Sequence, residues 1–103
     1  MPVDLLWTPR AEEDLVEIHA FIPLDSPDAA DRIVDKLTAA AEMLRHHPRL
    51  CQRRPEIRSY LRMMTEWPYV LLYEAIPDED GVPVLFVEIV RVLDGRRDLL
   101  ASI

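Results

Sequence analysis

The sequence contains very few residues of several types that often carry chemistry: one cysteine, two glycines, one lysine and three histidines among 103 residues. Cys51 stands alone, which excludes an internal disulfide and predicts a reducing, cytoplasmic setting for a chain with no recognisable signal peptide. Gly81 and Gly95 are too few for a phosphate-binding loop or a dinucleotide-binding motif. No apolar run approaches the length of a membrane span.

The three histidines do not predict a metal site. His19 falls within the first helical pattern, whereas His46 and His47 are neighbours at the end of the second. Adjacent side chains on a helix diverge, so these two cannot easily share an ion. We therefore expect no metal and no other cofactor, and we interpret Cys51 as a passive thiol.

The charge is acidic overall and unevenly distributed. Nineteen acids against twelve bases give a net charge of −7, which should repel nucleic acid. Residues 1–44 hold ten acids and three bases, whereas residues 45–103 hold nine of each. All the bases except Lys36 are arginines, which suit bidentate contacts with carboxylates or phosphates. Within the second half, residues 45–62 hold six arginines and one glutamate, so the chain carries a basic segment on an acidic body.

The first half of the chain reads as a strand and two helices. Residues 3–7 alternate as a strand does, and Thr8-Pro9 then caps a helix whose apolar stripe is Ala11, Leu15, Ile18 and Ile22. The acids at 12–14 suit the positive end of that helix, where we expect them to be solvated. Ser26-Pro27 starts a second helix that stops before Pro48, and the short link predicts an antiparallel hairpin.

The second half changes to extended patterns. We expect strands at 57–64, 69–73 and 84–92, with turns at Trp67-Pro68 and Asp80-Gly81. The order predicts one α+β domain over residues 1–103. In it, an N-terminal strand and a helical hairpin precede a three-stranded antiparallel meander, and both helices pack on one face of the sheet.

Enzymatic chemistry is weakly indicated. Metal-free RNA cleavage would need a base, an acid and cations around the phosphate. The candidates for the cations and one phenol are Arg58, Arg62, Tyr73, Arg91, Arg96 and Arg97. No histidine or glutamate accompanies them in an obviously suitable place, although Glu74 and Glu88 lie on the same strands. We therefore predict no catalytic residues, and pairing of these arginines with the acidic helices is the simpler interpretation.

Several short motifs, in this order and spacing, resemble the RelE/ParE toxin superfamily of bacterial type II toxin–antitoxin modules. They cover nearly the whole chain: Trp7-Thr8-Pro9-Arg10-Ala11, Ser26-Pro27-Asp28-Ala29-Ala30, Arg54-Pro55-Glu56-Ile57-Arg58, Trp67-Pro68-Tyr69 and Gly95-Arg96-Arg97-Asp98. The opening of the second helix and the Gly-Arg-Arg-Asp tail are similar to the ParE branch. Asp94 stands where the family often has histidine before the glycine.

The resemblance implies inhibition of DNA gyrase by binding, without RNA cleavage. Arg96 and Arg97 would project from the edge of the sheet towards gyrase carboxylates or phosphates near its DNA gate, with Asp98 orienting one of them. Alternatively, these three residues close the C-terminal segment onto the body. The remaining target-binding candidates are Arg58 and Arg62, which would share a strand face, and Arg91.

The resemblance also implies a partner, a ParD-like antitoxin with a ribbon-helix-helix DNA-binding end. An amphipathic segment of that antitoxin should dock where the helical hairpin leaves apolar surface uncovered, at Leu15, Ile18 and Ile22. Contact with DNA would then be indirect, through the antitoxin. Two alternatives stay open: a RelE-like ribosome-dependent mRNA endonuclease, and a non-toxic relative that only forms the complex.

Overall fold

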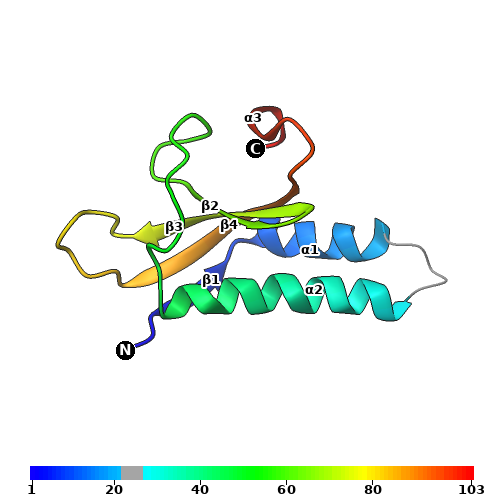
Figure 1. Cartoon of the computed structure of the whole chain (residues 1–103), viewed down its shortest axis with the longest axis horizontal. Coiled ribbons are helices and arrows are strands. Elements are labelled where there is room, and N and C mark those ends of the chain that lie inside the picture. The colour runs from blue at the N-terminus through cyan, green and yellow to red at the C-terminus, as the bar shows by residue number, and fades with distance from the viewer. Residues whose placement is uncertain (22–26) are drawn as a thin grey trace.

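The computed structural model describes residues 1–21 and 27–103, which form a sheet, two long helices and a short C-terminal helix (Figure 1). None of the described helices is both long and apolar enough to cross a membrane. In chain order the elements are β1 (Asp4–Trp7), α1 (Pro9–Phe21), α2 (Pro27–Glu42), a 3-10 turn (Met43–Arg45), β2 (Arg62–Glu66), β3 (Tyr69–Ile76), β4 (Phe86–Asp94) and α3 (Leu99–Ser102).

The sheet has four strands in the order β1-β4-β3-β2. β2 pairs antiparallel with β3, and β3 with β4, whereas β1 runs parallel to β4, from Asp4 opposite Phe86 to Trp7 opposite Ile89. The predicted α+β class is confirmed. The predicted meander describes only β2 to β4, however, because the complete sheet is mixed.

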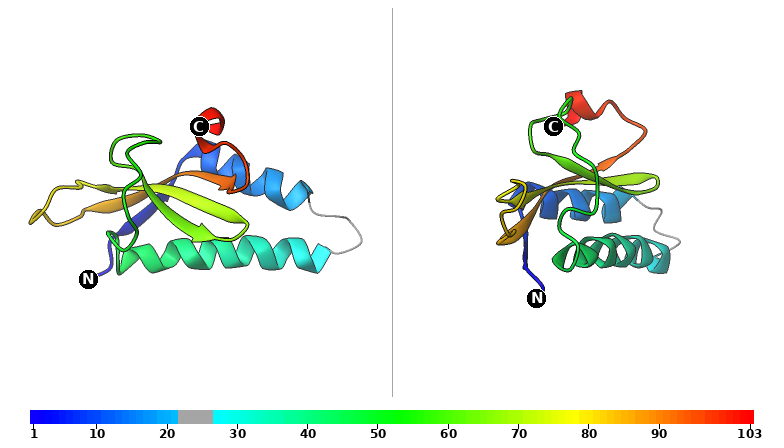
Figure 2. Two further views of the ribbon diagram at one scale, coloured as in Figure 1. Left: turned by 45° about the horizontal axis from the view of Figure 1, so that its top comes forward. Right: turned by 60° about the vertical axis from the view of Figure 1, so that its left-hand side comes forward.

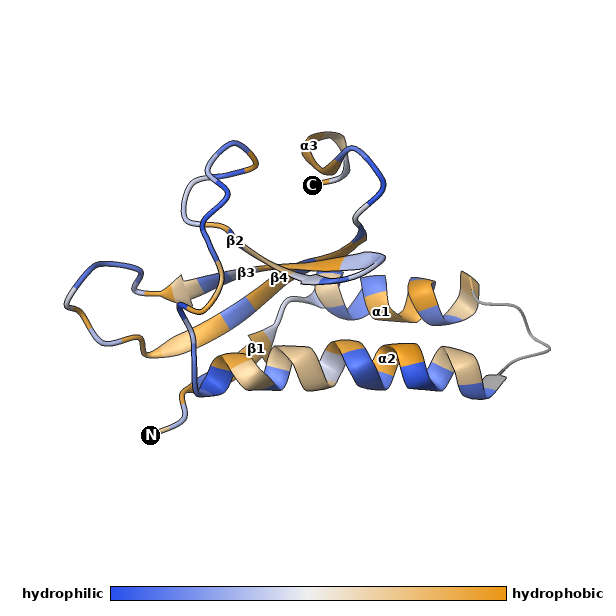
Figure 3. Ribbon diagram, in the orientation of Figure 1, coloured by the Kyte–Doolittle hydropathy of each residue, from blue (hydrophilic) through white to orange (hydrophobic). Residues whose placement is uncertain are grey.

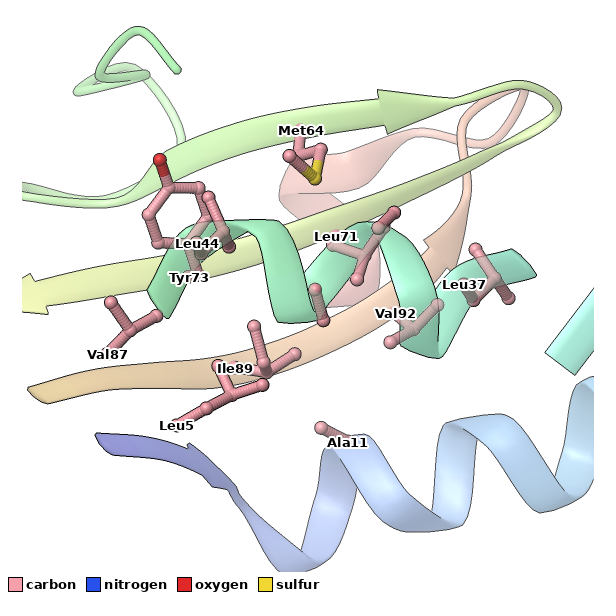
Figure 4. Close-up of a cluster of buried hydrophobic side chains, with 12 residues drawn as sticks. Leu5, Ala11, Leu37, Leu44, Met64, Leu71, Tyr73, Val87, Ile89 and Val92 are labelled. Atoms are coloured by element: carbon pink, nitrogen blue, oxygen red, sulfur yellow. The ribbon is translucent and has the colours of Figure 1, made fainter. Parts of the chain in front are cut away.

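Both long helices cover one face of the sheet (Figures 1 and 2). Hydrophobic and hydrophilic bands alternate along them, as amphipathic helices require (Figure 3). The core between helices and sheet contains Leu37 and Leu44 from α2, Ala11 from α1, and Tyr73 and Ile89 from the strands (Figure 4). Each of these five side chains is at most 1% exposed.

The other face of the sheet is also partly covered. A smaller cluster there contains Leu61, Val70, Leu72 and Leu93. Ile57, from the loop before β2, and Leu99, from α3, pack against it. The loop and α3 rise side by side from the face opposite the long helices (Figures 1 and 2).

The segment before β2 is a set of turns rather than a strand, so the strand predicted for 57–64 is confirmed only from Arg62 onward. The amides of Ile57 and Arg58 both donate to the carbonyl of Arg54, and Tyr60 has a φ of 67°. These turns end at Leu61, and β2 begins only at Arg62. Arg58 and Arg62 therefore do not share a strand face.

Thr8 links the start of α1 to β4. Its Oγ1 accepts a hydrogen bond from the amide of Ala11 at 3.1 Å and donates one to the carbonyl of Val90 at 2.9 Å. We expect Thr8→Ala to lower the free energy of unfolding by about 1–2 kcal/mol, because it removes the cap and leaves the Val90 carbonyl without its donor. Urea unfolding should show this loss, and Thr8→Ser, which keeps the hydroxyl, should recover most of it.

Candidate functional site

A buried ion pair joins α1 to β4. Asp14 is 3% exposed, and its carboxylate accepts hydrogen bonds from Arg91 at 2.8 and 3.2 Å and from the amide of Val92 at 2.9 Å. β1 ends at Trp7, opposite Ile89. On that edge, the last part of β4 therefore has no neighbouring strand. Asp14 takes the place of that strand as an acceptor. The expectation of a solvated Asp14 was therefore wrong.

Arg91 also holds the C-terminus. Its Nη1 donates to the carbonyl of Ser102 at 2.6 Å, so one guanidinium connects α1, β4 and α3. Arg91 is only 9% exposed. All three of its side-chain nitrogens donate to acceptors within the chain. This predicted target-binding residue therefore holds α1, β4 and α3 together.

A second buried carboxylate gathers three arginines. Arg62 binds Asp78 through Nε and Nη2, each at 2.9 Å, and Arg53 binds the same carboxylate at 3.0 Å. Arg49 reaches it at 3.3 Å and also donates to the carbonyl of Val82. Arg62, another predicted target-binding residue, is thus buried, and its ion pair with Asp78 connects β2 to the loop after β3.

Asp78 stays ionised under this arrangement. Burial acts to raise its pKa, but the hydrogen bonds and positive charges of Arg62 and Arg53 outweigh burial and hold the pKa well below its usual value.

Nearby, the hydroxyl of Tyr73 accepts a hydrogen bond from the amide of Cys51 at 3.2 Å. Burial raises the pKa of Tyr73, so its phenol remains protonated.

Three of the predicted target-binding residues follow β4. Arg96 binds Asp94 at 2.9 and 2.6 Å, and the hydrogen bond from its side chain is the main reason why the pKa of Asp94 falls to about 2. Asp98 caps α3 by accepting from the amides of Leu100 and Ala101. Asp94, rather than Asp98, therefore orients an arginine.

Gly95 allows this segment to turn close to the β2–β3 connection. Its amide donates to the carbonyl of Pro68 at 2.7 Å. A Cβ at position 95 would lie 3.1 Å from a methyl of Val70 and 3.2 Å from the Pro68 oxygen, which is tighter than most side chains tolerate. The absence of a side chain thus fixes where Arg96 and Arg97 leave the sheet.

Arg58 and Arg97 are exposed and have no carboxylate within ion-pair distance among residues 1–21 and 27–103. Only one other arginine of that part of the chain, Arg32 on α2, shares this property. Arg58 and Arg97 are therefore the predicted target-binding arginines whose charges stay available to another molecule.

A C-terminal groove of about 350 Å³ lies between α1 and the end of β4. Arg96 and Arg97 line it together with the apolar side chains of Ile18 and Phe21, and Asp14 and Arg91 form part of its wall. The groove thus combines exposed guanidinium groups with apolar surface, which is suited to a protein surface bearing carboxylates.

A separate hairpin groove of about 340 Å³ lies between the two long helices and is lined by Leu15, Val16, His19, Ala20 and Val34. The structure therefore places two predicted antitoxin-binding residues in different grooves, with Leu15 in the hairpin groove and Ile18 in the C-terminal one. The third, Ile22, lies outside the described residues.

The histidines and Cys51 are the remaining residues that the sequence analysis considered. His19 Nε2 lies 2.9 Å from Asp31 Oδ1, which joins α1 to α2, and His46 and His47 are exposed. Within the described ranges, no three histidine, cysteine, aspartate or glutamate side chains are grouped so that they could hold a metal ion. Cys51 is half-buried, and its carbonyl accepts from Arg62.

The chain matches the family model described as the ParE toxin of the type II toxin–antitoxin system parDE, over residues 5–99. It is 35% identical to protein Y4kP of Sinorhizobium fredii, whose name describes it as a toxin, over 77% of this chain and 82% of that protein. It is 34% identical to Toxin RelE3 of Caulobacter vibrioides, over 68% of this chain and 77% of that protein.

Two solved structures share the fold. A chain of the chromosomal ParDE toxin–antitoxin system of P. aeruginosa superposes with a TM-score of 0.69 at 22% identity, covering 89% of this chain and 95% of that one. A chain of the toxin–antitoxin complex RelBE2 of Mycobacterium tuberculosis gives a TM-score of 0.61 at 22% identity, covering 91% and 99%. At this identity, the likeness concerns the fold alone.

Proposed function

Since this chain belongs to the family of ParE toxins of type II toxin–antitoxin systems, we propose that it arrests growth by binding DNA gyrase, with no chemical step of its own. The observation that carries this proposal is the pair Arg96 and Arg97 at the rim of the C-terminal groove, beside the apolar Ile18 and Phe21. Such a surface can bind carboxylates on a protein or compete with DNA phosphates.

The burial of other arginines favours binding over RNA cleavage. Of the residues considered for a ribonuclease site, Arg62 and Arg91 are engaged in buried ion pairs, and Tyr73 is fully buried. A phosphodiester could reach only Arg58, Arg96 and Arg97 of that set. Cations alone can orient a phosphate but supply neither the general base nor the general acid that cleavage needs.

The target surface that we propose consists of Arg96 and Arg97, and Arg58 extends it on the loop that rises beside α3 (Figure 1). Asp94 and Asp98 have positioning roles, since the first holds the guanidinium of Arg96 and the second caps α3. Arg62 and Arg91 support this surface from within and do not take part in it.

The partner that we propose is a ParD-like antitoxin whose ribbon-helix-helix end binds DNA, so that this chain contacts DNA only through it. Leu15 and Ile18 are half-buried, pack against the core and each line a groove beside α1. A segment that wraps around α1 could contact both. Occupation of the C-terminal groove would also cover Arg96 and Arg97, which would explain neutralisation.

The proposal predicts the order in which syntheses stop. After induction of this chain alone in a bacterium, thymidine incorporation should fall before methionine incorporation. The double variant Arg96→Ala/Arg97→Ala should restore growth, because each lost charged hydrogen bond should weaken binding roughly tenfold or more. Arg32→Ala removes an exposed arginine from α2, which like Arg97 has no ion-pair partner among the described residues, and should remain toxic.

Other outcomes would identify the alternatives. Early loss of translation with cleaved messages and continuing replication would point to a RelE-like ribonuclease. Normal growth with the folded chain present would point to a relative that only forms the complex. Equal relief by Arg32→Ala would show that toxicity depends on overall charge rather than on the rim of the C-terminal groove.

A further inference from the structure

Tyr60 lies in a tight turn just before β2. The amide of Leu61 donates to the carbonyl of Arg58 at 3.1 Å, so Tyr60 is the third of the four residues that form a β-turn. Its φ of 67° belongs to the left-handed region, where a bulky side chain crowds the backbone and glycine is favoured. Leu61, the next residue, is fully buried and thereby fixes the turn in this conformation.

Burial of the Tyr60 side chain does not offset this backbone strain. The residue is 55% exposed and packs against neither buried cluster of the described residues. Its ring faces the guanidinium of Arg53, whose Cζ lies 5.6 Å from the ring centroid, and such a contact is weak at an exposed site. A glycine here would relieve the strain and leave the core unchanged. Strained residues of this kind gather at functional sites, so the exposed ring calls for a role outside the fold.

Two arginines near the Tyr60 ring have hydrogen-bond donors to spare. Arg58, two residues before Tyr60, is exposed and has no carboxylate within ion-pair distance in the described part of the chain. Arg53 donates to Asp78 through Nη2, whereas its Nε and Nη1 have no acceptor in that same part of the chain. We call Arg53, Arg58 and Tyr60 the tyrosine platform. It presents an exposed aromatic ring together with two guanidinium groups.

The tyrosine platform lies on the same side of the molecule as α3. The loop that carries it rises beside α3 from the face opposite the long helices (Figures 1 and 2). Ile57 from this loop and Leu99 from α3 pack against the same small cluster, so the two segments lie close together. Arg96 and Arg97 precede α3 directly in the chain. A protein surface laid against these two arginines can therefore extend over the platform.

We propose that the tyrosine platform anchors the chain to an acidic surface of its protein target, with the ring of Tyr60 in an apolar pocket and Arg53 and Arg58 against carboxylates beside it. This inference rests on the proposed function and adds a second contact to the target surface. Tyrosine and arginine are the residue types that most often dominate the energy of protein interfaces. A base stacked on the ring would belong to a nucleic acid, which the net charge of −7 repels.

Tyr60→Gly separates a binding role from a structural one. Because glycine accepts a positive φ, this variant should unfold at the same urea concentration as the original chain or at a higher one. In biolayer interferometry on immobilised DNA gyrase, it should nevertheless bind more weakly by about tenfold or more. Tyr60→Phe keeps the ring and should bind as the original chain does. Ser59→Gly places a glycine in the same turn, retains the ring and should also bind normally.

Three results would overturn the inference. They are unchanged gyrase binding by Tyr60→Gly, an equal loss of binding by Ser59→Gly, and a clear fall in the unfolding midpoint of Tyr60→Gly. A fluorescent single-stranded oligonucleotide tests the other class of ligand. If Tyr60→Gly weakens binding of the oligonucleotide and leaves gyrase binding unchanged, the ring serves a nucleic acid and the protein anchor is wrong.

Growth after induction of each variant separates this result from the proposed function. A chain that arrests growth without binding gyrase, and does so less after Tyr60→Gly, keeps the tyrosine platform and loses gyrase as its target. A chain that binds gyrase equally with and without the ring keeps the proposed function and loses the platform. A chain that neither binds gyrase nor arrests growth loses both.

Discussion

Asp14→Asn is expected to lower the free energy of unfolding by about 3–5 kcal/mol, the usual cost of leaving a buried charge without its partner. Arg91 is 9% exposed, and its guanidinium binds both oxygens of Asp14. Asparagine keeps the shape of the side chain but offers a single acceptor and no charge. Since domains of this size are stable by only about 5–15 kcal/mol, the loss should be evident in urea unfolding at neutral pH.

Two companion variants make this prediction specific. Glu13→Gln removes an exposed acid that pairs with Arg10 at the surface, and it should change stability by less than about 0.5 kcal/mol. Adding Arg91→Gln to Asp14→Asn removes the unpaired charge, so the double variant should lose clearly less than the sum of the two single losses. Additive losses would contradict a coupled pair.

Asp78→Asn is expected to cost a similar amount, about 3–5 kcal/mol, because Arg49, Arg53 and Arg62 share this carboxylate. The side chain of Asp78 is 2% exposed, so water cannot replace the lost acceptor. The substitution should release the loop after β3 from the segment before β2. Faster hydrogen exchange of amides in both segments would show that release.

The same residue should control the stability of the protein in acid. Since the folded pKa of Asp78 lies below its ordinary value of 3.8, the unfolded chain binds more protons as the pH falls from about 5. The stabilisation that Asp78 provides is therefore fully present above that range and is lost as the pH falls towards the folded pKa. Urea unfolding between neutral pH and about pH 3 should show a shallower decline for Asp78→Asn than for the original chain.

Asp94 provides the comparison. Its pKa of about 2 gives the same sign of pH dependence, but its partner Arg96 is 62% exposed and the pair is screened by water. Asp94→Asn should thus change both the stability and its acid dependence much less than Asp78→Asn. Equal effects of the two variants would contradict the importance of burial at Asp78.

The order of the elements could be predicted from the sequence because periodicity and caps are local. Thr8-Pro9 starts α1 as expected, and the apolar run at 69–73 belongs to the buried strand β3. The parallel pairing of β1 with β4 was not predictable in this way, because no local pattern identifies the neighbour of a strand. The same applies to α3, which has only four residues and is held by Arg91.

The candidate site was harder to predict because the sequence alone does not show whether a charged residue is exposed or buried. Arg62, Arg91, Arg96 and Arg97 were treated alike, yet the first two are buried in ion pairs and the last two are exposed. Their acidic partners, Asp78 and Asp14, lie 16 and 77 residues away in the chain. Only the tertiary structure separates arginines that support the fold from arginines that another molecule can contact.

The most direct test of the central claim uses the purified chain in a DNA gyrase supercoiling assay on relaxed plasmid with ATP. We predict inhibition by the original chain and by Arg32→Ala, and little inhibition by Arg96→Ala/Arg97→Ala. Addition of the antitoxin should restore supercoiling. Full gyrase activity at saturating amounts of the folded chain, together with cleavage of ribosome-bound messages in a parallel reaction, would contradict the account.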